Sequence, residues 1–493
     1  DSMAANTTGA SNVGVGHSVL VANTTGTQNV AVGALALDAA VSVNNNTAIG
    51  YNALTVCTIG DNTAVGSESM AATTSGTYNT AVGKSSLNDN TTGANNTAIG
   101  AFALDENTSA DSNTAIGKSA GTAVTTGASN TYVGAEAGEG NTTHGHNTGI
   151  GFRALETNHS SSDGYNTALG SGAGQTITGS YNTFLGARSG DATTSGDYTT
   201  AVGADAYGAV GTGSGNTAIG NRALYINTSG AENVAVGRRA MDALGANTTA
   251  DSNTAVGHAA LLVNTTGAEN TALGYRSLVA NTTGTKNVAM GSSSLDECTT
   301  GDFNTAVGTS ALTSVTTSDS NTAVGTSAGQ EITTGASNTA VGKSASPALT
   351  TGAENTCIGS STAEGLTSGG NNICIGLGAG NSGNPGGLLQ TTDNRIVIGN
   401  ASSANAHIQI DWTVASDKRD KTDVTPLDMG LGFINKLEPV TYKWDKRAKY
   451  EEGNTPDGTH KEAWLDVGFL AQDVEELEAE FGHKINDKTN LTT

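Results

Sequence analysis

The residues best suited to binding a metal are His144 and His146, in the segment THGH. In an assembly of three chains, a His-x-His pair on the common axis would place six imidazoles around one ion. The pair occurs once, in a segment where the surrounding sequence carries turn residues whose side chains face solvent. A solvated turn is therefore the favoured interpretation, and neither a metal nor another cofactor is predicted.

The four cysteines are Cys57, Cys298, Cys357 and Cys374, and none belongs to a CxxC pair. Cys357 and Cys374 occupy the same position of two successive equivalent segments, where alanine is usual. Two side chains stacked in parallel suit disulfide geometry poorly, so we expect two small buried side chains. The cysteines do not indicate a redox compartment.

Other catalytic patterns are weak. Glycine-rich segments such as 376–380 lack the strand, helix and lysine of a phosphate loop, and coil turns explain them. The sequence also lacks the GGxGxD pattern of calcium-binding β-rolls. Its carboxylates are spread through turns without an evident cluster, and only 4% of residues are aromatic. We therefore expect no enzymatic activity on an external substrate such as a glycan.

Most of the chain is one repeated unit. The block Asn-Thr-Ala-Val-Gly recurs with small variations in 23 copies, from Asn12 to Asn394, and most of the spacings between copies equal one 17-residue unit. In the copy NTAVGHAALLVNTTG, Val256 and Leu261 are the apolar positions, and residues 264–267 have turn chemistry, because Asn and Gly tolerate positive φ. The block alternates with a period of two, which is typical of a strand. The sequence predicts an all-β, repetitive β-solenoid or β-roll over residues 1–376, with one coil per unit.

Stacked coils place equivalent residues above one another at roughly 4.8 Å, so that 23 coils form a rod of about 110 Å. Val or Ile then forms one apolar seam and Leu another, and the asparagines can form a ladder of amide hydrogen bonds. A coil with one Val and one Leu has a thin core. We therefore expect self-association into a homotrimer, in which each chain covers the apolar edge of the next.

Charge excludes some partners. The net charge is −23, from 22 basic and 45 acidic residues. Nucleic acids and anionic membrane surfaces bind clusters of Lys and Arg, so neither is an expected partner. No run of about 18 apolar residues is present, so no membrane insertion is predicted.

The repeated block resembles the heads of trimeric autotransporter adhesins, in which an apolar-Ala-Ile-Gly block marks each coil of a trimeric β-roll. The resemblance covers about residues 1–376, and the 17-residue unit is longer than is usual in that family. It implies the type of coil and the trimer more directly than a biological role.

Composition changes after a predicted β connector, residues 377–415. The segment that follows, 416–493, holds 11 of the 22 Lys and Arg and two of the three Trp. The sequence there predicts helices over 426–437 and 472–481, a strand over 440–444 and an apolar segment over 467–470. This pattern indicates a small α+β domain, residues 416–493.

Three segments of this domain, SDKRDKTDV, INKLEPVTYKW and VGFLAQDVEEL, resemble the endosialidase-type intramolecular chaperone domain. That domain directs trimerisation of the phage fibre before it and then cuts itself off, using a Ser and a Lys five residues later. The matching residues here are Ser416 and Lys421. The resemblance implies that Lys421 takes the proton of the Ser416 hydroxyl and that the Ser416–Asp417 bond breaks, with Ala415–Ser416 as second choice. The family usually continues into a long C-terminal helix that joins three chains, so we expect residues 416–493 to be an incomplete domain or to have a disordered end.

We therefore expect a structural and attachment fibre of a virion, like a tail fibre, on the virion surface or otherwise extracellular. Its partners would be its own copies and a host-surface receptor, glycan or protein. A cellular trimeric surface adhesin is the first alternative. An ice-binding β-solenoid is the second, because flat threonine ladders can order water. The expected chemistry is at most one self-cleavage.

Overall fold

The computed structural model describes residues 1–158, 164–193, 195–208, 211–243, 249–383, 387–403, 430–443, 461, 463 and 465–481. The chain divides into two compact units, residues 1–401 and 402–493. Among the described residues, no helix is both long and apolar enough to cross a membrane.

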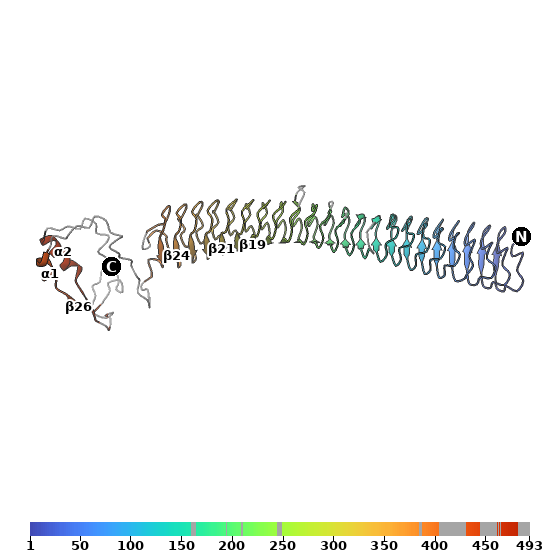
Figure 1. Ribbon diagram of the computed structural model, residues 1–493, viewed down its shortest axis with the longest axis horizontal. Helices are drawn as coiled ribbons and strands as arrows, with labels where there is room; N and C mark the ends of the chain where they lie inside the picture. The colour runs from blue at the N-terminus through green and yellow to red at the C-terminus, as the bar shows by residue number, and fades with distance from the viewer. Residues whose placement is uncertain are drawn as a thin grey trace. The chain divides into compact units, whose positions relative to one another are not determined.

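The first unit is a stack of coils (Figure 1), each contributing one short strand to a single parallel sheet of 23 strands. The strands of this sheet are β1 (Val13–Val15), β2 (Val30–Val32), β3 (Thr47–Ile49), β4 (Thr63–Val65), β5 (Thr80–Val82), β6 (Thr97–Ile99), β7 (Thr114–Ile116), β8 (Thr131–Val133), β9 (Thr148–Ile150), β11 (Thr167–Leu169), β13 (Thr183–Leu185), β14 (Thr200–Val202), β15 (Thr217–Ile219), β16 (Val234–Val236), β17 (Thr254–Val256), β18 (Thr271–Leu273), β19 (Val288–Met290), β20 (Thr305–Val307), β21 (Thr322–Val324), β22 (Thr339–Val341), β23 (Thr356–Ile358), β24 (Ile373–Ile375) and β25 (Ile396–Ile398). A second, two-stranded parallel sheet pairs β10 (Thr157–Asn158) with β12 (Thr176–Ile177).

Adjacent strands pair in register, so each repeat position forms a row along the stack. Ala81, for example, lies opposite Ala98, and Val82 lies opposite Ile99. The predicted β-solenoid of 17-residue coils is confirmed. The sheet continues past residue 376, because β25 pairs with β24.

The predicted seam of Val and Ile is present, but the prediction that it contributes to the core of each coil is wrong. The central alanine of the strand is buried, as at Ala255, whereas Val256 lies partly exposed on the outer face. The reason is the period of two: the asparagine that begins the block points inward, so the alanine two residues later does too, and Thr and Val face outward. The predicted leucine row is interior, with Leu261 fully buried.

The predicted asparagine ladder is confirmed. The Asn96 side chain accepts a hydrogen bond from the Asn113 backbone N–H at 2.9 Å, and its amide donates to the Ala110 carbonyl at 2.8 Å. The last copy begins at Arg395 and not at the predicted Asn394, because the Arg395 backbone N–H donates to the Asn372 side chain as the ladder residues of other coils do.

The prediction for the Asn-Thr-Thr-Gly turn had the right place and the wrong reason. Within residues 264–267, no φ is positive; Asn264 instead donates through Nδ2 to the Gly267 carbonyl at 2.7 Å. A Cβ at Gly267 would lie 2.3 Å from the Gly284 carbonyl of the next coil, so this coil favours glycine there, whereas Ala110 and Ser318 occupy the equivalent position of other units. Positive φ occurs elsewhere, including at buried leucines such as Leu261, at 52°.

Three coils have an aromatic core. Tyr132 and Phe184 replace the central alanine and are fully buried. In the same coils, the interior leucine is replaced by Gly138 and Gly190, where an added Cβ would clash with the aromatic ring. Tyr207 instead replaces a leucine, and its hydroxyl donates to the Gly213 carbonyl at 2.8 Å. Interior volume is therefore conserved by paired large and small substitutions.

The second unit has a small α+β fold in its described residues. Helix α1 (Gly430–Lys436) precedes β26 (Val440–Tyr442), which pairs antiparallel with β27 (Asp466–Gly468), and helix α2 (Ala471–Glu480) follows. Phe433 packs edge-on against Phe481, with ring centroids 5.8 Å apart. These elements agree with the predicted ones to within a few residues where the structure describes them.

Candidate functional site

A continuous outward row of aliphatic side chains, here called the outer row, runs along the large sheet. It contains the last residue of every strand in the large sheet, from Val15 through Ile99 to Ile398. Ile99 is 39% exposed, and other members are similarly exposed or half-buried. A half-buried threonine or valine begins most of these strands, as at Thr97, and flanks the outer row on the same face. A stripe of this kind, repeated in every coil, is typical of a surface that packs against another protein.

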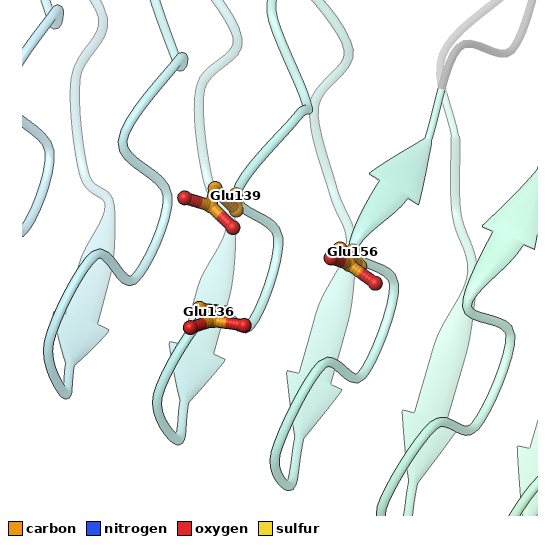
Figure 2. A group of neighbouring side chains, drawn as sticks. All are labelled: Glu136, Glu139 and Glu156. Atoms are coloured by element: carbon orange, nitrogen blue, oxygen red, sulfur yellow. The ribbon is translucent and has the colours of Figure 1, made fainter.

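A group of three carboxylates lies on two adjacent coils, contrary to our expectation that no cluster forms. Figure 2 shows Glu136 and Glu139 on one coil and Glu156 on the next. One oxygen from each lies within 4.8 Å of the others, so the group has the oxygen ligands of a cation site. Arg153 already supplies a positive charge, with Nε 2.7 Å from Glu136 and 3.5 Å from Glu156. Burial, with the charges of Glu136 and Glu156, raises the pKa of Glu139.

Two further carboxylates in the same repeat row as Glu139 have perturbed acidity. Burial raises the pKa of Asp105 to about 6, and the neighbouring charges of Asp89, Glu106 and Glu68 raise it as well. Burial also raises the pKa of Asp191 to about 6, against the opposing effect of Arg188. Each has one buried carboxylate oxygen without a hydrogen-bond partner. Local burial explains these shifts without a catalytic role.

The cysteine prediction is confirmed. Cys357 and Cys374 lie opposite one another in β23 and β24, and both are buried and free. A hydrogen bond to Cys357 and burial raise the pKa of the Cys374 thiol. A buried, protonated thiol is a poor nucleophile.

The two histidines have different surroundings. His144 is half-buried and His146 is exposed, with its ring stacked on Tyr165 at a centroid distance of 4.7 Å.

The second unit exposes apolar side chains on its described elements. Leu431 and Ile434 of α1 and Val467 of β27 are all more than half exposed. A groove of about 560 Å³ runs between the end of α1 and helix α2, with Phe469 and Leu477 in its lining. Apolar exposure of this extent in a small unit is typical of a surface that associates.

The predicted catalytic residues Ser416 and Lys421, and the predicted bond between Ser416 and Asp417, lie outside the described residues.

The fold and surfaces define the class of protein: a parallel β-solenoid rod joined to a small, separate α+β unit. Comparison with known families then gives one match. Residues 416–483 match the family model described as chaperone of endosialidase. Neither the curated proteins nor the solved structures gave a match. The match supports the predicted intramolecular chaperone and implies a trimerisation-related role for the C-terminal part.

Sequence reasoning missed the group of three carboxylates and its ion pair with Arg153, which lies one coil after Glu136. The signal was present in the repeat itself, because residues one unit apart become neighbours. Glu136 and Arg153 occupy the same position of successive units, and so do Glu139 and Glu156. Aligning the charged residues of successive units would have placed all four together.

Proposed function

We propose that the protein is a homotrimeric fibre whose rods associate through the outer row and whose C-terminal part is a trimerisation chaperone. One observation carries the proposal: the outer row is unbroken along the 23 strands. Another copy of this chain has the same spacing between coils, so it can cover the row from end to end. The chaperone-family match of residues 416–483 supports the same assembly.

A charge-introduction experiment tests the association. The test variant carries Val82→Asp, Ile99→Asp and Ile116→Asp, on three successive coils of the outer row. The control variant carries three new aspartates on the exposed turns of the same coils, at Thr92, Ser109 and Thr126. Native mass spectrometry should give trimers for the parent and the control, and monomers for the outer-row variant. A monomeric parent, or a trimeric outer-row variant, would contradict the proposal.

The proposed self-cleavage rests on the resemblance of Ser416 and Lys421 to the family's serine and lysine, within the matched residues. Intact mass under denaturing conditions should show a break at Ser416–Asp417 in the parent. Ser416→Ala should abolish the break, and Lys421→Ala should slow it severely by removing the base. An intact parent would mean that the C-terminal part stays attached as a cap.

We further propose that the fibre belongs to a virion and binds a host-surface receptor. Antibodies against the rod should detect it on purified virus particles from a producing culture. Detection on cell envelopes in place of particles would favour the cellular adhesin.

Ice binding stays a second candidate because a threonine row flanks the outer row on the same face, as at Thr80, Thr97 and Thr114. In the trimer this face is covered, so the two functions compete for one surface. Thermal hysteresis measured on the parent and on the monomeric outer-row variant distinguishes them: activity in the parent would favour ice binding.

A further inference from the structure

Four aromatic side chains form a raised feature on the rod, here called the aromatic ridge. His146, Tyr165, Tyr181 and Tyr198 each immediately precede the ladder position in four successive coils. Their ring centroids are 4.7, 5.1 and 5.1 Å apart, and successive planes differ by 4 to 7°. All four are exposed, and Tyr198 reaches 64%.

The aromatic ridge has two defined ends. The equivalent residue is Ser129 in the coil before His146, and Gly215 in the coil after Tyr198. Both are much smaller than an aromatic ring. The ridge is therefore four coils long on a row that elsewhere carries mostly small or polar residues.

The aromatic ridge continues into the outer row. Thr167 and Thr183 lie two residues after ridge tyrosines and are exposed, where most equivalent threonines are half-buried. Two residues further on, Leu169 and Leu185 replace the usual Val or Ile and are 44% and 42% exposed. In these two coils, an exposed ridge residue, an exposed threonine and an exposed outer-row leucine therefore fall within five consecutive residues.

A repetitive rod has a register problem. Because each coil presents nearly the same outer residues, two rods could slide past one another by one coil and recover almost all of their contacts. A feature that does not repeat is needed to distinguish the correct alignment from the shifted one. The aromatic ridge is such a feature, and it adjoins the proposed interface.

We propose that the aromatic ridge fixes the axial register of the chains, by packing against a second copy of this chain. This inference rests on the proposed trimer. Stacking within the ridge blocks the faces of its inner rings, so the exposed parts are ring edges and hydroxyl groups. These suit a protein surface, where tyrosine is enriched, better than a flat ligand that needs a ring face. A shift of one coil moves Tyr198 or His146 past the end of the surface that receives the ridge.

The test removes the ridge and keeps the coil. Serine occurs at this position in other coils, so the test variant is Tyr165→Ser, Tyr181→Ser and Tyr198→Ser. The control variant, Tyr51→Ser, Tyr78→Ser and Phe303→Ser, removes three exposed aromatic rings that lie outside the ridge. Cryo-electron microscopy of the full chain then counts the trimers in which one rod is displaced by one coil.

In the parent, the three ridges should lie at one axial level, each against a neighbouring chain. The ridge variant should show at least ten times more displaced trimers, and the control should match the parent. Equal displacement in both variants would overturn the inference, as would parent trimers whose ridges face solvent. A ridge variant that no longer trimerises would also overturn it, by placing the ridge in association itself. A monomeric parent would instead overturn the proposed function on which the inference rests.

Discussion

Asn96→Ala tests whether the asparagine ladder holds adjacent coils together. The Asn96 side chain is fully buried and is the acceptor for the Asn113 backbone N–H. Its own amide donates to the Ala110 carbonyl, which also receives a bond from Asn107 at 3.2 Å. Alanine at position 96 would therefore leave the Asn113 N–H without its acceptor. The Ala110 carbonyl would keep its hydrogen bond from Asn107.

The expected cost follows from these partners. Loss of one hydrogen bond costs about 1 kcal/mol, and a buried donor without an acceptor costs about 1–3 kcal/mol more, so the local loss is about 2–4 kcal/mol. At about 1.4 kcal/mol per factor of ten, amide exchange near Asn113 should accelerate by about 30-fold to about 700-fold. Hydrogen-exchange mass spectrometry suits this test because unfolding of a long repeat array is not a two-state process.

The control is Asn88→Ala, whose side chain bonds only to exposed Asp89 in the same turn. Its effect should stay within about threefold, as for other surface substitutions. Asn96→Asp adds a check on sign: burial disfavours the carboxylate, so the excess of its exchange rate over that of the parent at the same pH should shrink as pH falls and the acid becomes protonated. Equal exchange in the Asn96 and Asn88 alanine variants would refute the ladder's role.

Three further sets of substitutions test the interior and the charges. Gly138→Leu introduces the usual interior residue, yet it should be strongly destabilising because its side chain would clash with the Tyr132 ring. Tyr132→Ala alone should cost about 3–5 kcal/mol. The double variant should melt above either single variant, because the leucine then fills the space that the ring leaves. Because the pKa of Asp105 is raised to about 6, the folded state binds its proton more tightly than the unfolded state, so stability should fall as pH rises through about 4–6. Melting at pH 4 and 8 should show that Asp105→Asn removes part of this fall. Asp242 is fully buried and lies 3.0 and 2.7 Å from two arginines, so Asp242→Ala should cost its coil about 3 kcal/mol. Asp296→Ala, at a more exposed pair, should cost under about 1 kcal/mol, and hydrogen exchange of the local amides measures both effects.

The C-terminal part illustrates a different relation between sequence and structure. Its helices and strands followed from local apolar patterns such as those around Ile434 and Val467, and the elements agree with the structure where it is described. The roles of Ser416 and Lys421 came only from resemblance, because a serine followed by a lysine is common and burial decides whether that lysine can act as a base.

The sequence determined the coil because each unit repeats the same block of residues at nearly the same spacing. The spacing of the blocks gave one strand per coil, and the asparagine in each block predicted the ladder that Asn96 and Asn113 form. In-register stacking then follows, since equivalent residues satisfy one another only when aligned. The period-two alternation of the block also predicted which residues share a face of the strand.

Only the tertiary structure decided which face is inside. Alternation groups Asn with Ala and Thr with Val, and hydrophobicity alone suggested that Val256 would be buried. The inward asparagine reverses this choice, because its hydrogen bonds reach the turn across the coil interior. The tertiary structure likewise brought Glu136, Glu139 and Glu156 together, and stacked Tyr165 on Tyr181. These contacts join different coils, so they depend on how the coils stack and not on any local pattern.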